Sequence, residues 1–294
     1  MFKFIGKIIL AIVIFFGLNL LISTPIGIIA GIMAMVQLDG ELSSDALMGV
    51  IESNPLLRTL SYTLSAACGA AAAAIMFAAF DRSGGWHLGW RQLGWFAKGL
   101  LGMLLGALFI TLSYVMVLLL GGIQVIAVAW SSSVITAILF DIIIFTAVAV
   151  GEELFSRGYI YGAAKKQYGI IFAVVVSSVL FALLHSMNPG VFSSVFPMLN
   201  LFLAGVMLAL FREWSGGLWV PIGVHLTWNY FQGDVLGMAV SGTQTPSILH
   251  NEIRDPFLAG GQFGLEGTIV TTIIMVAVCV WLGLSIRRRL RTIS

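Results

Sequence analysis

Long apolar runs dominate this sequence and restrict its fold more than any other feature. A helix needs about 20 apolar residues to cross a hydrocarbon layer of about 30 Å. Eight runs of suitable length stand near residues 8–36, 59–80, 99–120, 133–160, 169–186, 191–211, 217–235 and 265–286. Because helices satisfy their own backbone hydrogen bonds in lipid, these runs predict an all-α, polytopic membrane helix bundle with about eight transmembrane helices.

Composition narrows the class of protein further. Hydrophobic residues make up 59% of the 294 positions and charged residues make up 10%, which excludes an ordinary soluble domain. A net charge of +2 provides no basic surface of the kind that nucleic acid requires. Cys68 and Cys279 fall inside predicted spans, so neither indicates a disulfide framework or a thiolate zinc site. We therefore expect the lipid bilayer as a partner and no nucleic acid.

The charged residues between the runs predict the orientation of the chain. The connection at 38–58 is mainly acidic, and its acids are Asp39, Glu41, Asp45 and Glu52. Basic residues recur in alternate connections, among them Arg82, Arg91, Lys98, Lys165, Lys166, Arg212 and the cluster Arg287 to Arg291. Because basic connections stay on the cytoplasmic side, both termini are predicted to be cytoplasmic.

A small group of charges interrupts the apolar pattern at Glu152, Glu153 and Arg157. A helix advances about 100° per residue, so Glu153 and Arg157 share a face and can form an ion pair. Glu152 points to another face and has no counter-ion of its own in this segment. Such a pair of acids can keep one carboxylate structural and leave its neighbour free for chemistry.

Two histidines are predicted at a depth similar to that of Glu152. Glu152 and His185 lie at comparable distances on either side of one predicted turn, and His225 lies in a later span, a few helical turns beyond its own loop. Asn229 follows His225 by four residues on the same helix face. Phe181 precedes His185 by the same spacing and gives that imidazole an apolar neighbour. The acid and the imidazoles are therefore expected to meet in the cytoplasmic half of the membrane.

Each of these residues also has a purely structural interpretation. Glu153 with Arg157 is most simply a helix-stabilising ion pair. A single histidine inside a membrane often serves packing or hydrogen bonding, and Asn229 could join helices in the same way. Asp141, almost three turns before Glu152, could be a second acid near the site, a member of a proton path or a structural group. Two histidines and an unpaired glutamate at one depth are harder to explain by structure alone.

The spacing of these residues resembles the CPBP intramembrane proteases, the CAAX-prenyl-protease and bacteriocin-processing group also called Abi proteins. Glu152, Glu153 and Arg157 match the family motif E-E-x-x-x-R. The segments 181–185 and 225–229 match F-x-x-x-H and H-x-x-x-N. The resemblance covers roughly residues 134–232. We therefore divide one membrane domain into N-terminal helices at 1–132, a catalytic core at 133–235, and an external loop with a last helix at 236–294.

The resemblance implies an intramembrane endopeptidase that acts on a membrane-associated peptide or protein. In this chain, Glu152 would be the general base that activates a water together with His185, and His225 with Asn229 would stabilise the oxyanion. Supporting roles are implied for Glu153, Arg157 and Phe181. This assignment agrees with amide hydrolysis, which needs a deprotonated water and donors aimed at the developing negative oxygen.

The dependence on a metal remains open at this level. In a metalloprotease-like version, Glu152, His185 and His225 would hold a zinc ion and leave a position for water. In a metal-free version they would act as a glutamate-type protease. The position of Asn229 on the His225 face favours the metal-free version, because an amide suits oxyanion stabilisation better than zinc ligation.

The function has two alternatives of other classes. Acids and histidines inside a bilayer also form ion or proton paths in coupled transporters, although the chain shows no inverted repeat. A non-catalytic immunity or scaffold protein could keep the same fold. The sequence does not name the substrate of a protease, since prenylated C-terminal motifs, bacteriocin leaders and other membrane peptides are all compatible.

Overall fold

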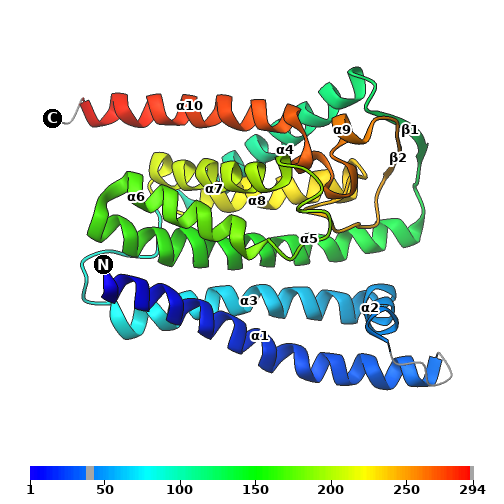
Figure 1. Ribbon diagram of the computed structural model, residues 1–294, viewed down its shortest axis with the longest axis horizontal. Helices are drawn as coiled ribbons and strands as arrows, with labels where there is room; N and C mark the ends of the chain where they lie inside the picture. The colour runs from blue at the N-terminus through cyan, green and yellow to red at the C-terminus, as the bar shows by residue number, and fades with distance from the viewer. Residues whose placement is uncertain (38–42, 292–294) are drawn as a thin grey trace.

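The computed structural model describes residues 1–37 and 43–291, so Asp39 and Glu41 of the acidic connection lie outside the described residues. Its helices run side by side along one long axis, with both termini toward the same end (Figure 1). Six helical stretches among the described residues are long and apolar enough to cross a membrane: Phe2–Val36, Pro55–Phe80, Trp95–Leu119, Ser132–Leu184, Phe196–Ser215 and Ile269–Arg291. The prediction of an all-α polytopic membrane bundle is confirmed, and the chain is an integral membrane protein.

The elements follow one another as helices with two short strands near one end. In chain order they are α1 (Phe2–Gln37), α2 (Ser44–Ser53), α3 (Pro55–Phe80), α4 (Trp95–Leu119), β1 (Ile123–Val128), α5 (Ser132–Glu153), the π-helical η1 (Leu154–Ile160), α6 (Tyr161–Leu184), α7 (Phe196–Ser215), α8 (Trp219–Tyr230), the π-helical η2 (Phe231–Val235), β2 (Leu249–Ile253), α9 (Pro256–Ala259), the 3₁₀ turns η3 (Gly261–Phe263) and η4 (Leu265–Gly267), and α10 (Ile269–Arg291).

Six long apolar stretches among the described residues do not confirm the exact count of eight spans, which stays a prediction. The stretch Ser132–Leu184 contains a kink at Gly169, whose backbone is non-helical with φ of 83° and ψ of 178°. The chain turns there and runs back along the bundle (Figure 1). In addition, α8 has only 12 residues, because the chain leaves α-helical geometry at Phe231.

Glycines allow close helix contacts beside two of the predicted site residues. A Cβ at Gly151 would lie 2.1 Å from the Ala66 carbonyl oxygen, so α5 packs with its backbone against α3 immediately before Glu152. A Cβ at Gly223 would lie 2.3 Å from the Gly99 carbonyl oxygen, so α8 packs equally closely against α4 just before His225. Small residues are the usual basis of such packing in membranes.

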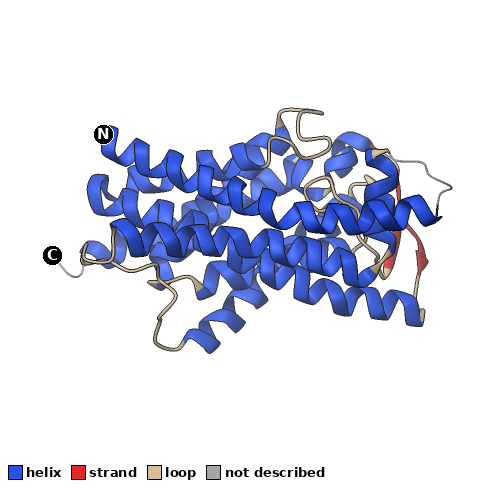
Figure 2. Ribbon diagram, turned by 90° about the horizontal axis from the view of Figure 1, so that it is seen from below, coloured by secondary structure: helices blue, strands red, loops and turns tan. Residues whose placement is uncertain are grey.

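Two segments that the sequence leaves as loops form a short sheet. Strands β1 and β2 pair antiparallel, with Ile123 opposite Ile253 and Val128 opposite Leu249. The sheet lies at the end of the bundle opposite the termini (Figure 2). The pairing joins the 121–132 linker to the long connection after α8. Register between strands so far apart in sequence depends on tertiary contacts and has no local signal.

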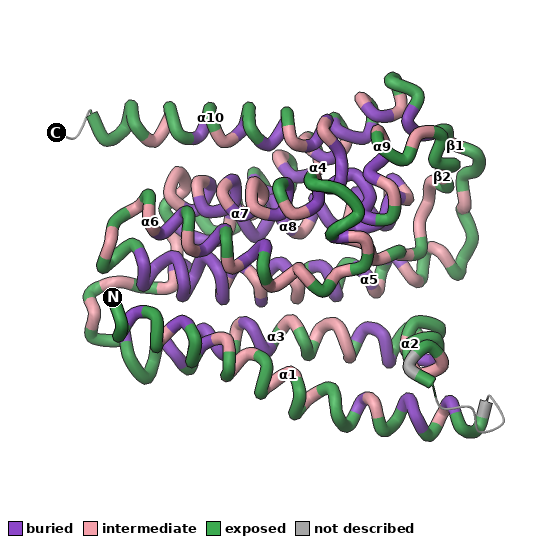
Figure 3. Tube along the Cα trace, viewed as in Figure 1, coloured by how far each residue is buried: buried purple, intermediate pink, exposed green. Residues whose placement is uncertain are grey.

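Burial is uneven across the bundle. Buried residues concentrate on α7, on α8 and in the loops before α10, whereas α1 exposes most of its length (Figure 3). Exposed apolar side chains such as Leu20, Leu21 and Ile171 lie on the outside of the helices, as expected for surfaces that face lipid. The exterior of the bundle is therefore apolar, and several polar side chains are buried inside it.

Asp141 belongs to a buried ionic group rather than to the predicted site. It is fully buried on α5 and pairs with the Arg58 guanidinium of α3, which also donates to Glu52 at 3.0 Å. Asp234, in η2 outside the six long helices, is equally buried. Burial and the neighbouring Asp141 carboxylate raise the pKa of Asp234 well above its usual range. Arg58 pairs with Asp141, so Asp141 is the buried acid placed to balance the guanidinium.

This arrangement predicts opposite outcomes for two isosteric variants. Asp234→Asn changes a buried carboxyl group whose two oxygens have no hydrogen-bond partner, so we expect the free energy of unfolding to change by less than about 1 kcal/mol. Asp141→Asn removes the buried counter-ion of Arg58 and should cost about 3–5 kcal/mol. Unfolding of both purified variants in mixed micelles measures the difference. Equal destabilisation by the two variants would contradict the assignment of the charge to Asp141.

Candidate active site

The acidic motif lies where α5 changes into the wider η1 turn. Glu152 and Glu153 are the last residues of α5, and Arg157 lies within η1. Arg157 Nη1 donates to Glu153 Oε1 at 2.7 Å, and both side chains are fully buried, so the predicted ion pair is confirmed. π-helical turns occur often at functional sites because they redirect side chains without ending the helix.

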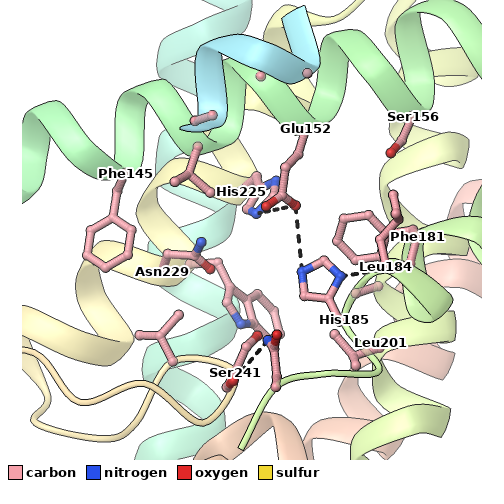
Figure 4. Close-up of a pocket in the computed structure, with 18 of the residues that line it drawn as sticks. Phe145, Glu152, Ser156, Phe181, Leu184, His185, Leu201, His225, Asn229 and Ser241 are labelled. Atoms are coloured by element: carbon pink, nitrogen blue, oxygen red, sulfur yellow. Dashed lines mark hydrogen bonds and ion pairs between the residues drawn. The ribbon is translucent and has the colours of Figure 1, made fainter. Parts of the chain in front are cut away.

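Glu152 faces both histidines, which come from two other helices. Its Oε2 atom lies 3.7 Å from His185 Nε2 and 4.0 Å from His225 Nε2 (Figure 4). His185 follows the last residue of α6, and His225 lies in the middle of α8. The side chain of Glu152 is 34% exposed, whereas that of His225 is 8% exposed. The structure therefore brings together the acid and the two imidazoles that the sequence placed at one depth. The Glu152 side chain is partly exposed, whereas its Oε2 atom is buried and has no hydrogen-bond partner.

The hydrogen bonds of the imidazoles define which nitrogen faces Glu152. His185 Nδ1 lies 2.8 Å from the carbonyl oxygen of Phe181, and His225 Nδ1 lies 3.1 Å from Glu153 Oε1. Both partners can only accept, so each Nδ1 carries a proton and donates it. The Nε2 atoms of both rings are consequently directed toward Glu152.

Phe181 packs against one side of the site. Its ring centroid is 4.6 Å from that of His185 and 6.1 Å from that of His225. The Arg157 guanidinium lies over the same ring, with Cζ 4.1 Å from the centroid, which is a cation–π distance. Phe181 therefore contacts three polar groups of the site, a larger role than the apolar neighbour predicted from its spacing to His185.

Glu153 connects the ion pair to the site. Its Oε1 accepts from both Arg157 and His225, so one carboxylate orients the guanidinium and the imidazole together. Arg157 Nη2 also donates to the Gly205 carbonyl of α7 at 3.3 Å. Glu153 and Arg157 thus form the structural ion pair that the sequence predicted. The same Glu153 carboxylate also orients His225, a residue of the predicted site.

The site opens into a cavity of about 530 Å³ inside the bundle. All four residues predicted to be catalytic line it: Glu152, His185, His225 and Asn229. The N-terminal helices contribute further walls, among them Phe15 and Phe16 of α1 and Tyr62 of α3. Most of the lining is apolar. Such a cavity can admit water and an apolar segment at the same time.

Several polar residues of the cavity were not predicted from the sequence. They lie in or beside the irregular segments of the fold, and they are Asn188, Trp228, Ser241 and Glu266. Glu266 had a signal, because it is an acid at the start of the apolar run 265–286. Asn188 and Ser241 had none, because a loop residue gives no periodicity from which its direction could be predicted. Trp228 lies on α8 between His225 and Asn229, where its side chain resembles an ordinary apolar packing residue.

The spacing of Glu152, His185 and His225 differs from that of ligands around one zinc ion. Ligands about 2.0–2.1 Å from a tetrahedral zinc lie roughly 3.3–3.4 Å from one another. The separations of 3.7 and 4.0 Å from Glu152 to the imidazoles are longer. Over the part of the chain that the structure describes, no group of three or more His, Cys, Asp or Glu side chains is placed to hold a metal ion. The residues as arranged therefore do not fit a zinc ion.

Comparison with protein families identifies the core of the chain. Residues 134–231 match the family model Rce1-like, described as type II CAAX prenyl endopeptidase Rce1-like. The matched segment, about a third of the chain, is similar to this family of CAAX proteases. The matched segment contains all three motifs, and the general activity that this family supports is that of a membrane endopeptidase of the CAAX type. No curated protein and no solved structure matches the chain.

The two adjacent acids are expected to differ sharply in their effect on stability. Glu153→Gln leaves Arg157 buried without its counter-ion and should lower the free energy of unfolding by about 3–5 kcal/mol. Glu152→Gln removes a partly exposed carboxylate that forms no ion pair with a permanent cation, so the loss should stay below about 1 kcal/mol. Thermal unfolding in detergent, followed by circular dichroism, distinguishes the two. A larger loss for Glu152→Gln would reverse the roles assigned here.

Proposed function

We propose that this protein hydrolyses a peptide bond of a membrane-associated peptide or protein, with a water molecule activated by Glu152 and His185. One observation carries the proposal. The acid and two imidazoles converge from three helices in a cavity that the membrane bundle encloses. Ionisable groups at such a depth are costly, and they persist where they serve a function.

The first step is the activation of water. Glu152 Oε2 and His185 Nε2 are 3.7 Å apart, too far for a strong direct hydrogen bond and close enough for one water to reach both. Glu152 takes a proton from this water, and the oxygen attacks the carbonyl carbon of the substrate.

The second requirement is stabilisation of the oxyanion. Asn229 lies one helical turn after His225 and lines the same cavity, so its amide N–H and a protonated His225 Nε2 can donate to the negative oxygen together. The Glu153 carboxylate, bonded to His225 Nδ1, favours the charged imidazole that this role needs. When the intermediate collapses, the proton on Glu152 passes to the leaving amine, which restores the carboxylate.

The shape of the cavity supports a substrate with a hydrophobic anchor. Phe15, Phe16, Phe145 and Phe155 line it together with aliphatic side chains, and polar groups concentrate near the catalytic acid. A peptide held at the bilayer by a prenyl chain is the first substrate to test, because the matched family model carries that name. We retain the cytoplasmic placement of both termini as part of the proposal, since it puts the site in the half of the membrane that a cytoplasmic substrate reaches.

The hydrolysis is proposed to be metal-free. The distances from Glu152 to the imidazoles exceed those of zinc ligands, and Asn229 supplies an amide donor on the face of His225. These features support a glutamate-type mechanism. Every proton transfer described above uses only groups of the chain and one water.

Substitution of Glu152, His185 and Asn229 tests the assignment of roles. Glu152→Gln and His185→Ala should reduce cleavage of a prenylated reporter peptide in proteoliposomes at least about 10³-fold, because water is no longer activated. Asn229→Ala should reduce kcat by about 10²-fold through the loss of one oxyanion donor. The matched control is Glu252→Gln on the exposed strand β2. Full cleavage by Glu152→Gln would refute the proposal and favour a transporter or scaffold.

Removal of metal ions provides a separate test of the mechanism. Activity of the purified protein should survive prolonged treatment with a strong chelator and passage over a chelating resin, since no step needs a Lewis acid. The measurement is the initial cleavage rate before and after treatment, with metal content determined by mass spectrometry. Loss of activity that zinc restores would overturn the metal-free proposal and leave the hydrolase proposal intact.

A further inference from the structure

Glu266 brings another carboxylate into the cavity, from a part of the chain outside the family match. It lies in the 3₁₀ turn η4 immediately before α10, and the match ends at residue 231. Its side chain is buried and lines the cavity that contains Glu152 and both histidines. None of the steps proposed above uses it.

The Glu266 carboxylate receives three hydrogen bonds from two walls of the cavity. Oε2 accepts from the main-chain N–H and from the hydroxyl of Ser241, each at 2.7 Å. Oε1 accepts from the indole N–H of Trp228 at 3.2 Å. Both partners line the cavity, so this one carboxylate connects the long loop after α8 to α8 itself.

The Ser241 end of this connection is a strained turn. Val240 and Thr243 pair across Ser241 and Gly242, and both central residues have positive φ, 46° and 86°. Within the described ranges, Ser241 is the one residue other than glycine with positive φ. Such a conformation persists where neighbours hold it. The carbonyl of Ser241 also accepts from Asn188, three residues after His185, at 3.1 Å.

The Trp228 end of the connection reaches the proposed oxyanion donors. Trp228 immediately precedes Asn229 on α8, so a bond that fixes the indole also limits rotation of this helix turn. The backbone of Glu266 is fixed in its turn, because Asn200 of α7 donates to its carbonyl oxygen at 2.7 Å. Ser241 lies across the cavity from Glu152, with His185 and Asn229 between them (Figure 4).

We propose that Glu266 is a positioning residue for the hydrolysis: it fixes the 240–243 turn and α8 as the cavity wall opposite Glu152. The inference rests on the proposed function. A carboxylate suits this place because all three incoming groups are donors and its two oxygens accept them all. A carboxamide accepts through one oxygen only, so Glu266→Gln must lose either the Ser241 bonds or the Trp228 bond.

The kinetic test compares Glu266→Gln with a control that loosens the same segment. Thr271→Val is the control, because Thr271 is buried and bonds to the Leu265 carbonyl at 2.7 Å but does not line the cavity. Glu266→Gln should lower kcat about 10-fold or more with little change in KM, since misplaced catalytic groups cost transition-state stabilisation. Thr271→Val should retain kcat. Equal losses of kcat in the two variants, in proportion to their thermal midpoints, would show a purely structural role.

A double variant tests the same bonds independently. Trp228→Phe removes the indole donor. When it is combined with Glu266→Gln, the side-chain amide at position 266 can turn its oxygen to Ser241. The double variant should therefore be no slower than Glu266→Gln alone, which is non-additive behaviour expected of direct partners. Additive losses of kcat would contradict the contact as the cause.

Hydrogen exchange measures the connection without reference to activity. The amides of 238–246 should exchange at least about 10-fold faster in Glu266→Ala than in Thr271→Val, because the Ser241 N–H loses its acceptor. Unchanged exchange would overturn the inference. The two proposals fail in different ways. The proposed function fails if Glu152→Gln still cleaves the substrate. This inference fails if Glu152→Gln is inactive but Glu266→Gln keeps full kcat.

Discussion

One buried carboxylate, that of Glu153, determines how the rest of the site is arranged. It accepts from Arg157 and from His225, and it is fully excluded from solvent. A buried charge of this kind is tolerated only with close partners. Its bond to Nδ1 of His225 directs Nε2 toward Glu152. The catalytic geometry on α8 therefore depends on an ion pair formed within a single helix, four residues apart.

Segments with irregular backbone line part of the cavity. The segments that follow α6 and α8 leave helical geometry, and in a bilayer such backbone is tolerated only where it is buried in protein or lines a water-filled space. Here the irregular segments are held by side chains such as Asn188, Asn200 and Glu266. Asn188 and Glu266, which satisfy this backbone, also line the cavity of the proposed site.

The parts of the chain outside the family match are closely joined to the core. Backbone contact at Gly151 and the ion pair of Arg58 with Asp141 join α3 to α5 at two depths. Strand pairing ties the linker before α5 to the loop after α8. The cavity accordingly has walls from the N-terminal helices, from the matched core and from the C-terminal segment.

The sequence by itself determined the membrane bundle, the Glu153–Arg157 pair and the common depth of Glu152, His185 and His225. These follow from the length of apolar runs and from the fixed geometry of a helix, which are local properties. Only the tertiary structure decided which nitrogen of each imidazole faces the acid, because the partner of His225 comes from another helix. Likewise it decided the sheet and the place of Glu266, since loop direction and strand register depend on contacts between distant segments, for which a sequence carries no periodic signal.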